Sequence, residues 1–385
     1  MGTEPDGRYA RQISLPGFGS RGQEALARAR VLCIGAGGLG SPAAIYLATA
    51  GVGTLGLIDD DRVELSNLHR QPLHTTADVG LKKVDSAART LRALNPDVRI
   101  VPIDRRLDAA DAVELVDGWD LVIDGSDSFA TRYIVSDATT LLGIPHLWAA
   151  VLGYGGQLSV FDPVTGPTYR DLFPRIPAPG SVPSCVQAGV LGVLPGIMGT
   201  ALAAEAIKLI TGIGTVLRGR VGVYDMRTAQ WEFIDLAARE STLRPAGPDQ
   251  IGQGLAPAVS AGELHRLLAG TGHAAPEAAT GTGTTGTAVP VVDVRTPAEH
   301  AADAIPGSVN LPVEDIAADP VGAVARLMEL GGEPGAGAPR RCYVYCESGT
   351  RSAHAVRLLG GTPGLQPIDV TGGMRAWRAL ESRST

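Results

Sequence analysis

The first half of the chain alternates short apolar runs with helical patterns. Residues 31–40, VLCIGAGGLG, form a β-branched apolar run followed by a glycine loop, and residues 41–52 continue with helical spacing. A second apolar run at 54–61 ends in acidic residues and completes a βαβ unit. Further strand-like runs lie at 99–104, 120–127 and 145–153. This alternation predicts a mostly parallel, doubly wound sheet.

Two other segments of this half have distinct patterns. Residues 8–30 predict a polar helix that ends in basic residues. Residues 176–204 carry no charge, and 188–204 are apolar. Proline and glycine interrupt this stretch, so the uninterrupted run of about 20 apolar residues that a membrane span needs is missing. We therefore expect a helix buried in the core or at a subunit interface.

The second half contains another α/β pattern. The segment 241–256 is rich in Pro, Gly and polar residues, which predicts an interdomain linker between domains at 1–240 and 257–385. Ser260 and Glu263 predict a capping box at the start of a helix. The remaining expected elements are this helix at 259–270, a low-complexity surface loop at 271–288, and strands at 289–295 and 341–346.

Composition narrows the class of protein. The chain has 385 residues, enough for two domains, and its net charge of −7 gives no general electrostatic footprint for nucleic acid or an anionic membrane. Its four cysteines include no C-x-x-C pair, which favours reduced thiols over a disulfide scaffold. Cys33 and Cys342 fall in predicted strands, so we expect them in the core. The first residues lack the features of a secretory signal, and we expect a cytoplasmic protein.

A glycine loop opens the first candidate site. Gly35, Gly37 and Gly40 form G-x-G-x-x-G between a strand and a helix, where backbone N–H groups can approach a phosphate. Asp59 ends the next strand, where a carboxylate can bind ribose hydroxyls. On these features alone, an NAD-dependent oxidoreductase is as good an interpretation as any other nucleotide-binding protein.

Cations after the second strand change that interpretation. Asn67, Arg70 and Gln71 lie just beyond the ribose position, and Lys83 follows. A triphosphate needs this neutralisation, whereas a dinucleotide needs few cations. Asp127 ends another strand, where a magnesium ion shared with the phosphates would sit. The alternative for these charges is a solvated loop.

Several motifs together resemble one superfamily. They are R-Y-x-R-Q at 8–12, GAGGLG, SNLHRQ at 66–71, VGLKK at 79–83, SDS at 126–128 and the run VPSCVQAGVLGVLPGIMGTALAAEAIKL at 182–209. They resemble the MoeB/ThiF superfamily of ubiquitin-activating-enzyme-like adenylyltransferases over roughly residues 5–240. The resemblance implies a Rossmann-like domain that binds ATP and Mg²⁺. It also implies adenylation of the C-terminal glycine of a small ubiquitin-like sulfur-carrier protein ending in Gly-Gly.

The same resemblance implies roles for single residues. Gly38 and Asp59 would hold the nucleotide, and Asp127 the magnesium ion. Arg11 would act in the active site of the other protomer of a homodimer formed through the adenylation domain. The phosphate ligands would be Asn67, Arg70 and Lys83, and the whole expected set is Gly35, Gly37, Gly38, Gly40, Asp59, Asp61, Ser66, Asn67, Arg70, Gln71, Lys83 and Asp127.

The cysteines of this chain differ from those of many members in one respect and match them in another. Members often hold a structural zinc through two C-x-x-C pairs, but the first pair's place is residues 168–171, TYRD, and the second segment, 241–250, has no cysteine. We therefore expect no zinc, as in the similar actinobacterial MoeZ-type proteins. Cys185 does match the family, where this cysteine is linked to a thioester or acyl-disulfide step. The alternative is a loop cysteine without a chemical role.

The second candidate site is a cysteine at the end of a strand. Cys346 precedes a short loop and a helix, so converging N–H groups, a helix N-terminus and Arg351 would favour a thiolate. A thiolate there can act as a nucleophile and carry a persulfide. The spacing C-x₄-R is one residue shorter than that of tyrosine phosphatases, so the pocket would be too small for a phosphate ester.

The motifs around this cysteine resemble the rhodanese domain over about residues 257–385. They are VVDVRTPAEHAADAIPGSVNLP at 291–312 and VTGGMRAW at 370–377. We expect Asp293, Arg295 and Glu299 to organise the fold and not to take part in catalysis. Inactive rhodanese modules usually lack the cysteine, whereas Cys346 and Arg351 are both present here. Sulfur transfer is therefore expected.

The two sites together predict one reaction sequence. The first domain would adenylate the carrier, and a Cys346 persulfide would then supply sulfur to give the carrier thiocarboxylate. Such carriers feed molybdopterin, thiamine, cysteine or other sulfur metabolites, and the donor would be thiosulfate or a cysteine desulfurase. The alternative is a nucleotide- and sulfur-sensing regulatory protein without turnover, which the presence of Arg70, Lys83 and Cys346 disfavours.

Overall fold

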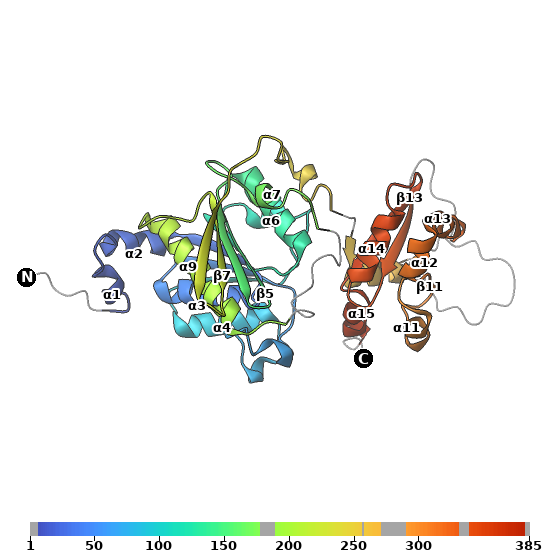
Figure 1. Ribbon diagram of the computed structural model, residues 1–385. Coiled ribbons are helices and arrows are strands. Elements are labelled where there is room, and N and C mark those ends of the chain that lie inside the picture. The colour runs from blue at the N-terminus through green and yellow to red at the C-terminus, as the bar shows by residue number, and fades with distance from the viewer. Residues whose placement is uncertain (1–6, 178–188, 256–257, 271–289, 331–338, 382–385) are drawn as a thin grey trace, which may run out of the picture. The chain divides into compact units, whose positions relative to one another are not determined.

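The chain forms two compact units, each built on one β-sheet (Figure 1). The computed structural model describes residues 7–177, 189–255, 258–270, 290–330 and 339–381. The main division between the units falls between Gln253 and Gly254.

The first unit contains an eight-stranded sheet in the order β3-β2-β1-β4-β5-β6-β7-β8. Strands β1 to β5 run parallel, and β6 to β8 continue the sheet in antiparallel pairs. The strands are β1 (Arg30–Ile34), β2 (Thr54–Ile58), β3 (Arg99–Ile103), β4 (Leu121–Asp124), β5 (His146–Leu152), β6 (Gly155–Phe161), β7 (Arg220–Asp225) and β8 (Gln230–Asp235). The predicted doubly wound, mostly parallel sheet is confirmed.

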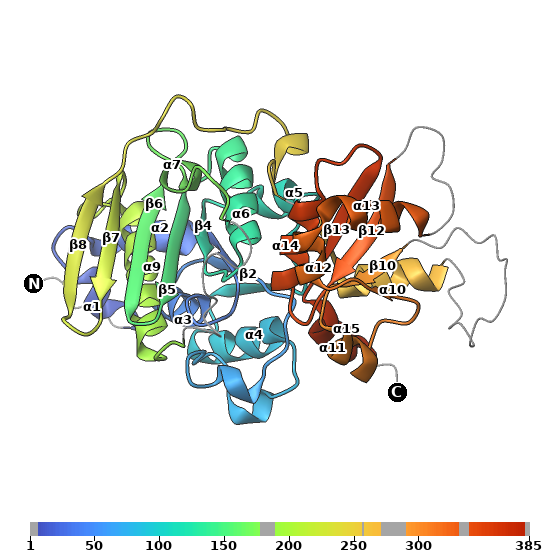
Figure 2. The same cartoon turned by 45° about the vertical axis from the view of Figure 1, so that its right-hand side comes forward.

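Two groups of helices accompany this sheet (Figure 2). Helices α3 (Gly40–Ala50), α4 (Lys83–Leu94) and α9 (Val193–Thr211) are in contact in one group, and α5 (Ala112–Val116), α6 (Phe129–Leu142) and α7 (Tyr169–Leu172) in the other. The central strands β1 and β2 are covered on both faces, since the side chains of Leu32, Cys33 and Leu57 are fully buried. Burial raises the pKa of the Cys33 thiol to about 12, which makes it a core residue as expected.

The prediction of one continuous helix at 8–30 is wrong. The structure has two helices there, α1 (Ala10–Ile13) and α2 (Gly19–Arg28). Pro16 lacks a backbone N–H, and Gly17 adopts a φ of +84°, so the segment between the helices turns.

Helix α9 explains the uncharged stretch of the sequence. Among the described residues it is long and apolar enough to cross a membrane, with a mean hydropathy of 1.5. It contacts α2, α3, β5 and β6, and Leu194, Met198 and Leu202 are fully buried. The helix therefore belongs to the core of the first unit, as predicted, although it begins and ends later than the apolar stretch at 188–204.

Much of the segment predicted as a linker is held against the first unit. The N–H of Gly252 donates to Asp137 on α6 at 2.8 Å, and the carbonyl of Gln253 accepts from Arg170 at 3.1 Å. Arg170 itself forms a buried pair with Asp137, at 2.6 and 2.8 Å. A Pro- and Gly-rich composition predicted flexibility here, but these hydrogen bonds fix the chain as far as Gln253.

The second unit contains a five-stranded parallel sheet in the order β11-β10-β12-β13-β9. Its strands are β9 (Ala258–Ser260), β10 (Val291–Asp293), β11 (Val309–Asn310), β12 (Arg340–Tyr345) and β13 (Leu365–Thr371). Its helices are α10 (Ala261–Gly270), α11 (Pro297–Ala302), α12 (Val313–Ala318), α13 (Pro320–Glu329), α14 (Thr350–Leu359) and α15 (Gly373–Glu381). The capping box of α10 is confirmed, because Ser260 and Glu263 exchange hydrogen bonds of 2.7 and 3.2 Å.

Candidate functional site

The first site lies at the edge of the large sheet where the strand order reverses. Strand β1 pairs with β2 on one side and with β4 on the other, so the connections that leave their carboxyl ends diverge. This switch point is where open α/β sheets bind ligands. The glycine loop follows β1, Asp59 follows β2, and Asp127 lies three positions beyond the end of β4.

The glycine loop turns sharply into helix α3. Gly35 has a φ of +89°, a conformation that favours glycine. A Cβ on Gly40 would lie 1.9 Å from the carbonyl oxygen of Gly35, so only glycine allows the helix to begin this close to the loop. The N-terminal N–H groups of α3 are thereby directed at the crevice, where they can bind phosphate.

Asp59 and Lys83 form a buried charged pair beside this loop. Asp59 accepts hydrogen bonds from the N–H of Ala36 at 2.8 Å and the N–H of Asp61 at 2.9 Å. Lys83 Nζ lies 2.7 Å from Asp61 and 4.0 Å from Asp59. Burial raises the pKa of Asp59, and the positive charge of Lys83 opposes that rise. Burial would lower the pKa of Lys83, but the carboxylates of Asp59, Asp61 and Asp127 raise it, so the lysine stays charged.

Asn67 and Gln71 are directed inward by a short 3₁₀ helix, Leu65–Asn67. Asn67 Oδ1 accepts from the N–H of Glu64 at 3.2 Å. Gln71 is buried, and its Oε1 has no hydrogen-bond partner among the described residues. A Cβ on Gly37 would lie 3.7 Å from Gln71 Nε2, so this amide faces the glycine loop. A buried oxygen without a partner fits a donor supplied by a ligand.

Arg70 borders the same loop and remains partly exposed. Its Nη1 donates to the carbonyl of Ser66 at 2.9 Å and lies 2.8 Å from His69 Nε2. A Cβ on Gly38 would lie 3.2 Å from Pro195, at the start of α9, and 3.6 Å from the Arg70 stem. The guanidinium is therefore near the loop without a carboxylate partner that would neutralise it, within the part of the chain that the structure describes.

Asp127 is exposed on a loop that other residues hold in place. Asp124 accepts from the N–H of Ser126 at 3.0 Å and from His146 at 3.3 Å, and both Asp124 and His146 are fully buried. Burial would raise the pKa of Asp124, but the hydrogen bond from His146 holds it below its ordinary value. Arg132 clamps the other side of the loop, because its Nε and Nη2 donate to the Ser126 carbonyl at 3.2 and 3.0 Å.

Sequence reasoning missed these supporting residues. Another residue to which the sequence analysis assigned no role is His74, which is buried between Ser86, at 2.9 Å, and the carbonyl of Ala36 in the glycine loop, at 3.2 Å. Burial lowers the pKa of His74, so it is neutral here. Asp124 alone gave a local signal, because it ends the strand that Asp127 follows. Arg132, His146 and His74 come from segments whose proximity depends on the tertiary fold.

The residues present fit a magnesium nucleotide. The glycine loop and the start of α3 supply N–H donors, and Asp59 supplies a carboxylate. Gln71 supplies a buried oxygen without a partner among the described residues, and Arg70 and Lys83 supply positive charge. Among the described residues, the carboxylates that lie close enough together to hold one ion are Asp59, Asp60 and Asp61, within 4.8 Å, and not Asp127.

The described structure does not test the roles expected for Arg11 and Cys185. Arg11 lies exposed on α1. Cys185 lies outside the described residues. Their roles stay predictions.

The second site places the sulfur of Cys346 in a cradle of donors at the end of β12. Its Sγ accepts a hydrogen bond from the N–H of Gly349 at 3.1 Å and lies 3.5 Å from the hydroxyl of Ser352. Gly349 caps helix α14 with a φ of +103°, so the helix N-terminus faces the sulfur. Cys346 is 1% exposed, so its side chain is buried at the end of β12. Cys342 is fully buried, and burial raises the pKa of its thiol to about 12.

Helix α15 fixes the far side of this loop. The N–H of Met374 donates to the carbonyl of Cys346 at 2.8 Å, and that of Arg375 to the carbonyl of Glu347 at 3.0 Å. A Cβ on Gly373 would lie 2.2 Å from the Cys346 carbonyl oxygen. The T-G-G-M segment therefore holds the reactive loop through close backbone contact.

We expect Gly373→Ala to slow sulfur loading of Cys346 by on the order of 10²-fold, because the added methyl would displace the loop. Loading is measured by the mass of one added sulfur atom on the intact protein. Gly361→Ala is the matched control, since Gly361 also has a positive φ, +79°, but nothing lies within 4 Å of its Cβ position. Equal loading rates in wild type and Gly373→Ala would contradict this role of the glycine.

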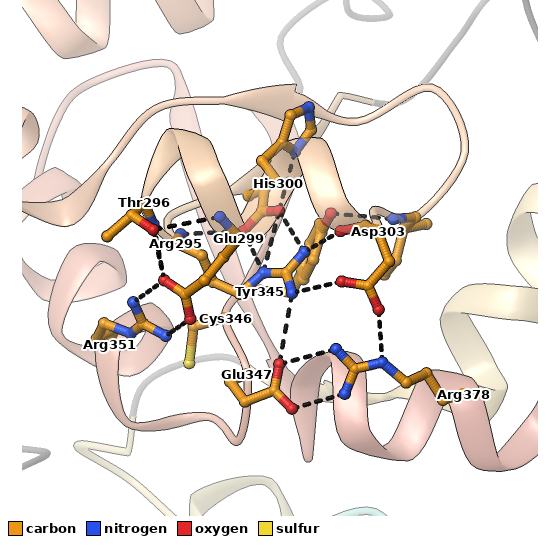
Figure 3. A network of polar contacts seen from close by, with 12 residues as sticks. Arg295, Thr296, Glu299, His300, Asp303, Tyr345, Cys346, Glu347, Arg351 and Arg378 are labelled. Carbon is orange, nitrogen blue, oxygen red and sulfur yellow. Dashed lines mark hydrogen bonds and ion pairs between the residues drawn. The ribbon is translucent and has the colours of Figure 1, made fainter.

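A network of ion pairs surrounds the cradle (Figure 3). Arg295 is 1% exposed and bonds Asp293 at 2.8 Å and Asp303 at 3.1 Å, so it ties β10 to the loop after α11. Arg378 on α15 pairs with Asp303 and Glu347, each at 2.6 Å. Asp293 and Arg295 thus organise the fold, as expected.

A polar cluster occupies the place that the resemblance gives to the first zinc-binding pair. Thr168 and Asp171 form a capping box at the start of α7. Asp171 also accepts from the N–H of Arg239 at 2.8 Å and from Arg244 Nη2 at 3.1 Å. Burial would raise the pKa of Asp171, but hydrogen bonds from the Thr168 N–H and other donors hold it below its ordinary value of 3.8. The two segments therefore meet through hydrogen bonds around one carboxylate.

We expect Asp171→Ala to lower the free energy of unfolding by about 2–4 kcal/mol, because it leaves buried donors without an acceptor. The depressed pKa means that Asp171 stabilises the fold above about pH 4, and that this contribution is lost as the pH falls through its folded pKa. Denaturant unfolding at several pH values measures both effects. Asp235→Ala, at an exposed ion pair with Arg220, should cost less than about 1 kcal/mol. A variant as stable as wild type at neutral pH would contradict the role of Asp171.

Comparison with known proteins shows the family to which the chain belongs. A ThiF family model matches residues 9–244, and a rhodanese-like domain model matches residues 276–380. The chain therefore belongs to the ThiF family and carries a C-terminal rhodanese-like domain, which confirms the resemblance that its motifs indicate.

The chain is similar to relatives that match nearly all of it and to one that matches 63% of it. The probable adenylyltransferase/sulfurtransferase MoeZ of Mycobacterium tuberculosis is 38% identical over 98% of this chain and 94% of that protein. The adenylyltransferase and sulfurtransferase MOCS3 of Mus musculus is 36% identical over 97% and 85%. The sulfur carrier protein adenylyltransferase of Thermus thermophilus is 48% identical over 63% of this chain and 91% of that protein.

Solved structures show the same fold for the first unit. PaaA is 26% identical with a TM-score of 0.52 over 62% of this chain and 77% of that chain. Escherichia coli MccB, solved with MccA-N7isoASN, is 20% identical with a TM-score of 0.57 over 63% and 76%.

Proposed function

We propose that this protein activates the C-terminal glycine of a small ubiquitin-like sulfur carrier as an acyl-adenylate and converts it to a thiocarboxylate with sulfur carried on Cys346. The observation that carries the proposal is the presence of two complementary sites in one chain. One presents a glycine loop with Arg70 and Lys83 at a sheet switch point, and the other holds a cysteine sulfur against the N-terminus of α14. The relatives named adenylyltransferase and sulfurtransferase support the combination.

The adenylation step needs positioning and charge neutralisation more than proton transfer. The carrier's carboxylate is ionised at neutral pH, so it can attack the α-phosphorus without a general base while pyrophosphate leaves. Asp59 would orient the nucleotide through its place beside the Ala36 N–H, and Arg70 and Lys83 would balance the phosphate charge. A magnesium ion held by Asp127 would add positive charge at the phosphates when bound.

The sulfur step uses the cradle of the second site. The Gly349 N–H and the Ser352 hydroxyl hold the Cys346 sulfur in position, and this sulfur would take up a further sulfur atom as a persulfide. The terminal sulfur then attacks the acyl-adenylate carbonyl and AMP leaves, which joins the carrier to Cys346 through a disulfide. An external thiol must cleave that bond to release the thiocarboxylate, and a second one reduces the mixed disulfide that is left on Cys346. The resemblance links Cys185 to a thioester or acyl-disulfide stage of this step.

Several finer assignments are part of the proposal. We propose a homodimer formed through the first unit, in which Arg11 acts in the partner's site, and a protein that holds no zinc because a hydrogen-bonded cluster around Asp171 replaces it. We place the protein in the cytoplasm, where its thiols stay reduced. The boundaries 1–240 and 257–385 describe the two functional parts.

The test follows pyrophosphate exchange into ATP with purified protein and candidate carriers. We expect exchange that depends on a carrier ending in Gly-Gly and is lost when its last glycine is removed. Sulfur loading of Cys346 without ATP should occur independently. Nucleotide binding without exchange for any carrier would favour the sensing protein instead.

A further inference from the structure

Glu299 holds the guanidinium that the reactive loop carries. Arg351 Nη1 and Nη2 each donate a hydrogen bond of 2.7 Å to one oxygen of the Glu299 carboxylate, a bidentate pair (Figure 3). Arg351 lies in the first turn of α14, and Gly349 at the cap of this helix donates to the Cys346 sulfur, so the arginine belongs to the helix end that faces the sulfur. The pair is about one-third exposed, with 31% of the arginine and 36% of the glutamate side chain accessible. The cation of the loop is therefore balanced before any substrate arrives.

The carboxylate is itself fixed in place. Glu299 Oε2 accepts from the N–H of Thr296 at 3.0 Å and from its hydroxyl at 2.9 Å, which forms the capping box at the start of α11. The hydrogen bonds from Arg351, followed by those from Thr296, lower the pKa of Glu299 to about 2. The carboxylate is thus ionised at every pH at which the enzyme would be assayed, and the pair persists.

Two other arginines of this network, Arg295 and Arg378, also have carboxylate partners. Arg378 pairs with Glu347 and Asp303, and buried Arg295 pairs with Asp293 and Asp303. Together with the Arg351 pair, the network holds three arginines against four carboxylates. The labelled network of Figure 3 therefore has no excess of positive charge.

Sulfur donors differ in the charge that this site must accept. With thiosulfate, the Cys346 thiolate attacks the outer sulfur, the S–S bond breaks, and a sulfite dianion leaves with the bonding electrons. With an organic hydropersulfide, R–S–SH, the thiolate attacks the terminal sulfur, and R–S⁻ leaves with the bonding electrons while the proton stays on the transferred sulfur. Both reactions leave a persulfide on Cys346. Only thiosulfate requires a place for a dianion, which an unopposed guanidinium would provide.

We propose that Glu299 is a specificity-determining residue that, by neutralising Arg351, makes Cys346 accept sulfur from organic persulfides in preference to thiosulfate. Glu299 does not touch the sulfur and acts through Arg351, so it is a positioning residue. The inference rests on the proposed sulfurtransferase function and names the chemical class of its donor.

The test measures single-turnover loading of Cys346 in the full chain, with thiosulfate or the hydropersulfide of mercaptoethanol as the sole donor. Glu299→Gln removes the charge and keeps an oxygen that can accept the capping bonds from Thr296. We expect the concentration of thiosulfate that gives half-maximal loading rate to fall about fivefold, as for an ion pair worth about 1 kcal/mol. Loading from the hydropersulfide should stay within about twofold of wild type.

Two further variants separate charge from structure. Thr296→Val removes a capping bond and leaves the carboxylate, so donor preference should not change. The double variant Glu299→Gln/Arg351→Gln is as neutral as the wild-type pair, so it should keep the wild-type preference, and it tests the proposal even if the single variant does not fold.

Three results would overturn the inference. One is an unchanged preference in a folded Glu299→Gln, and another is the same shift in the double variant as in the single one. The third is a wild-type preference for thiosulfate. Wild-type protein that loads from neither donor would contradict the sulfurtransferase function as a whole, which distinguishes the two failures.

Discussion

Cys346→Ser should lower sulfur transfer from either donor by on the order of 10³-fold or more and leave carrier-dependent pyrophosphate exchange within about twofold of wild type. A serine hydroxyl has a much higher pKa than a thiol and cannot hold a persulfide. The cradle donors, Gly349 and Ser352, belong to the second unit, whereas Arg70, Lys83 and Asp59 belong to the first. Intact mass of the protein after exposure to the donor, together with radiolabelled pyrophosphate exchange, measures the two activities separately.

The control for this result is Cys342→Ala. Cys342 lies on the strand that leads to Cys346, and burial raises the pKa of its thiol to about 12, so it cannot serve as the nucleophile. Loading should therefore survive in a folded Cys342→Ala. A loss of pyrophosphate exchange in a folded Cys346→Ser would show that the two chemistries are not divided between the units.

Arg11→Ala should abolish carrier-dependent pyrophosphate exchange and leave folding and dimerisation intact. Arg11 is exposed on α1, a helix without buried residues, so its removal costs little stability. In the proposed homodimer its charge serves the phosphates of the partner's nucleotide. Exchange assays and unfolding curves of the purified variant measure the two expectations.

Mixing two inactive variants tests whether Arg11 acts in the site of the partner subunit. When Arg11→Ala is mixed with Asp127→Ala and the subunits exchange, a hybrid dimer has one site with both groups intact. Random exchange should then restore about one quarter of wild-type activity, since half of the dimers are hybrids with one competent site of two. No rescue after verified subunit exchange would show that Arg11 acts within its own subunit.

The sequence alone was sufficient to predict those site residues that lie at or just beyond the ends of strands. Gly35, Asp59 and Asp127 come directly after or close to three apolar runs, and parallel strands bring their carboxyl ends to one edge. Cys346 was equally visible, because a strand, a short loop and a helix follow each other in the chain. These are local patterns combined with one topological rule.

The contacts that hold the site residues in place could not be predicted from the sequence in this way. Arg132 clamps a loop from the helix after it, and His146 reaches Asp124 from the next strand, which requires the sheet register to be known. The pairing of Glu299 with Arg351 joins residues 52 positions apart, so the sequence showed both residues without their mutual neutralisation. Composition indicated a linker at 241–256 but could not show that Arg244 and Gly252 within it form hydrogen bonds to Asp171 and Asp137 of the first unit.

The most direct test of the account is the intact mass of a carrier protein after incubation with this enzyme, ATP, Mg²⁺, a sulfur donor and a reducing thiol. The account predicts a carrier whose mass rises by the difference between one sulfur and one oxygen atom. It also predicts that this change requires ATP and Cys346 together. A carrier that remains a carboxylate, although it is adenylated and Cys346 is loaded with sulfur, would contradict the claim that the two units act in one reaction sequence.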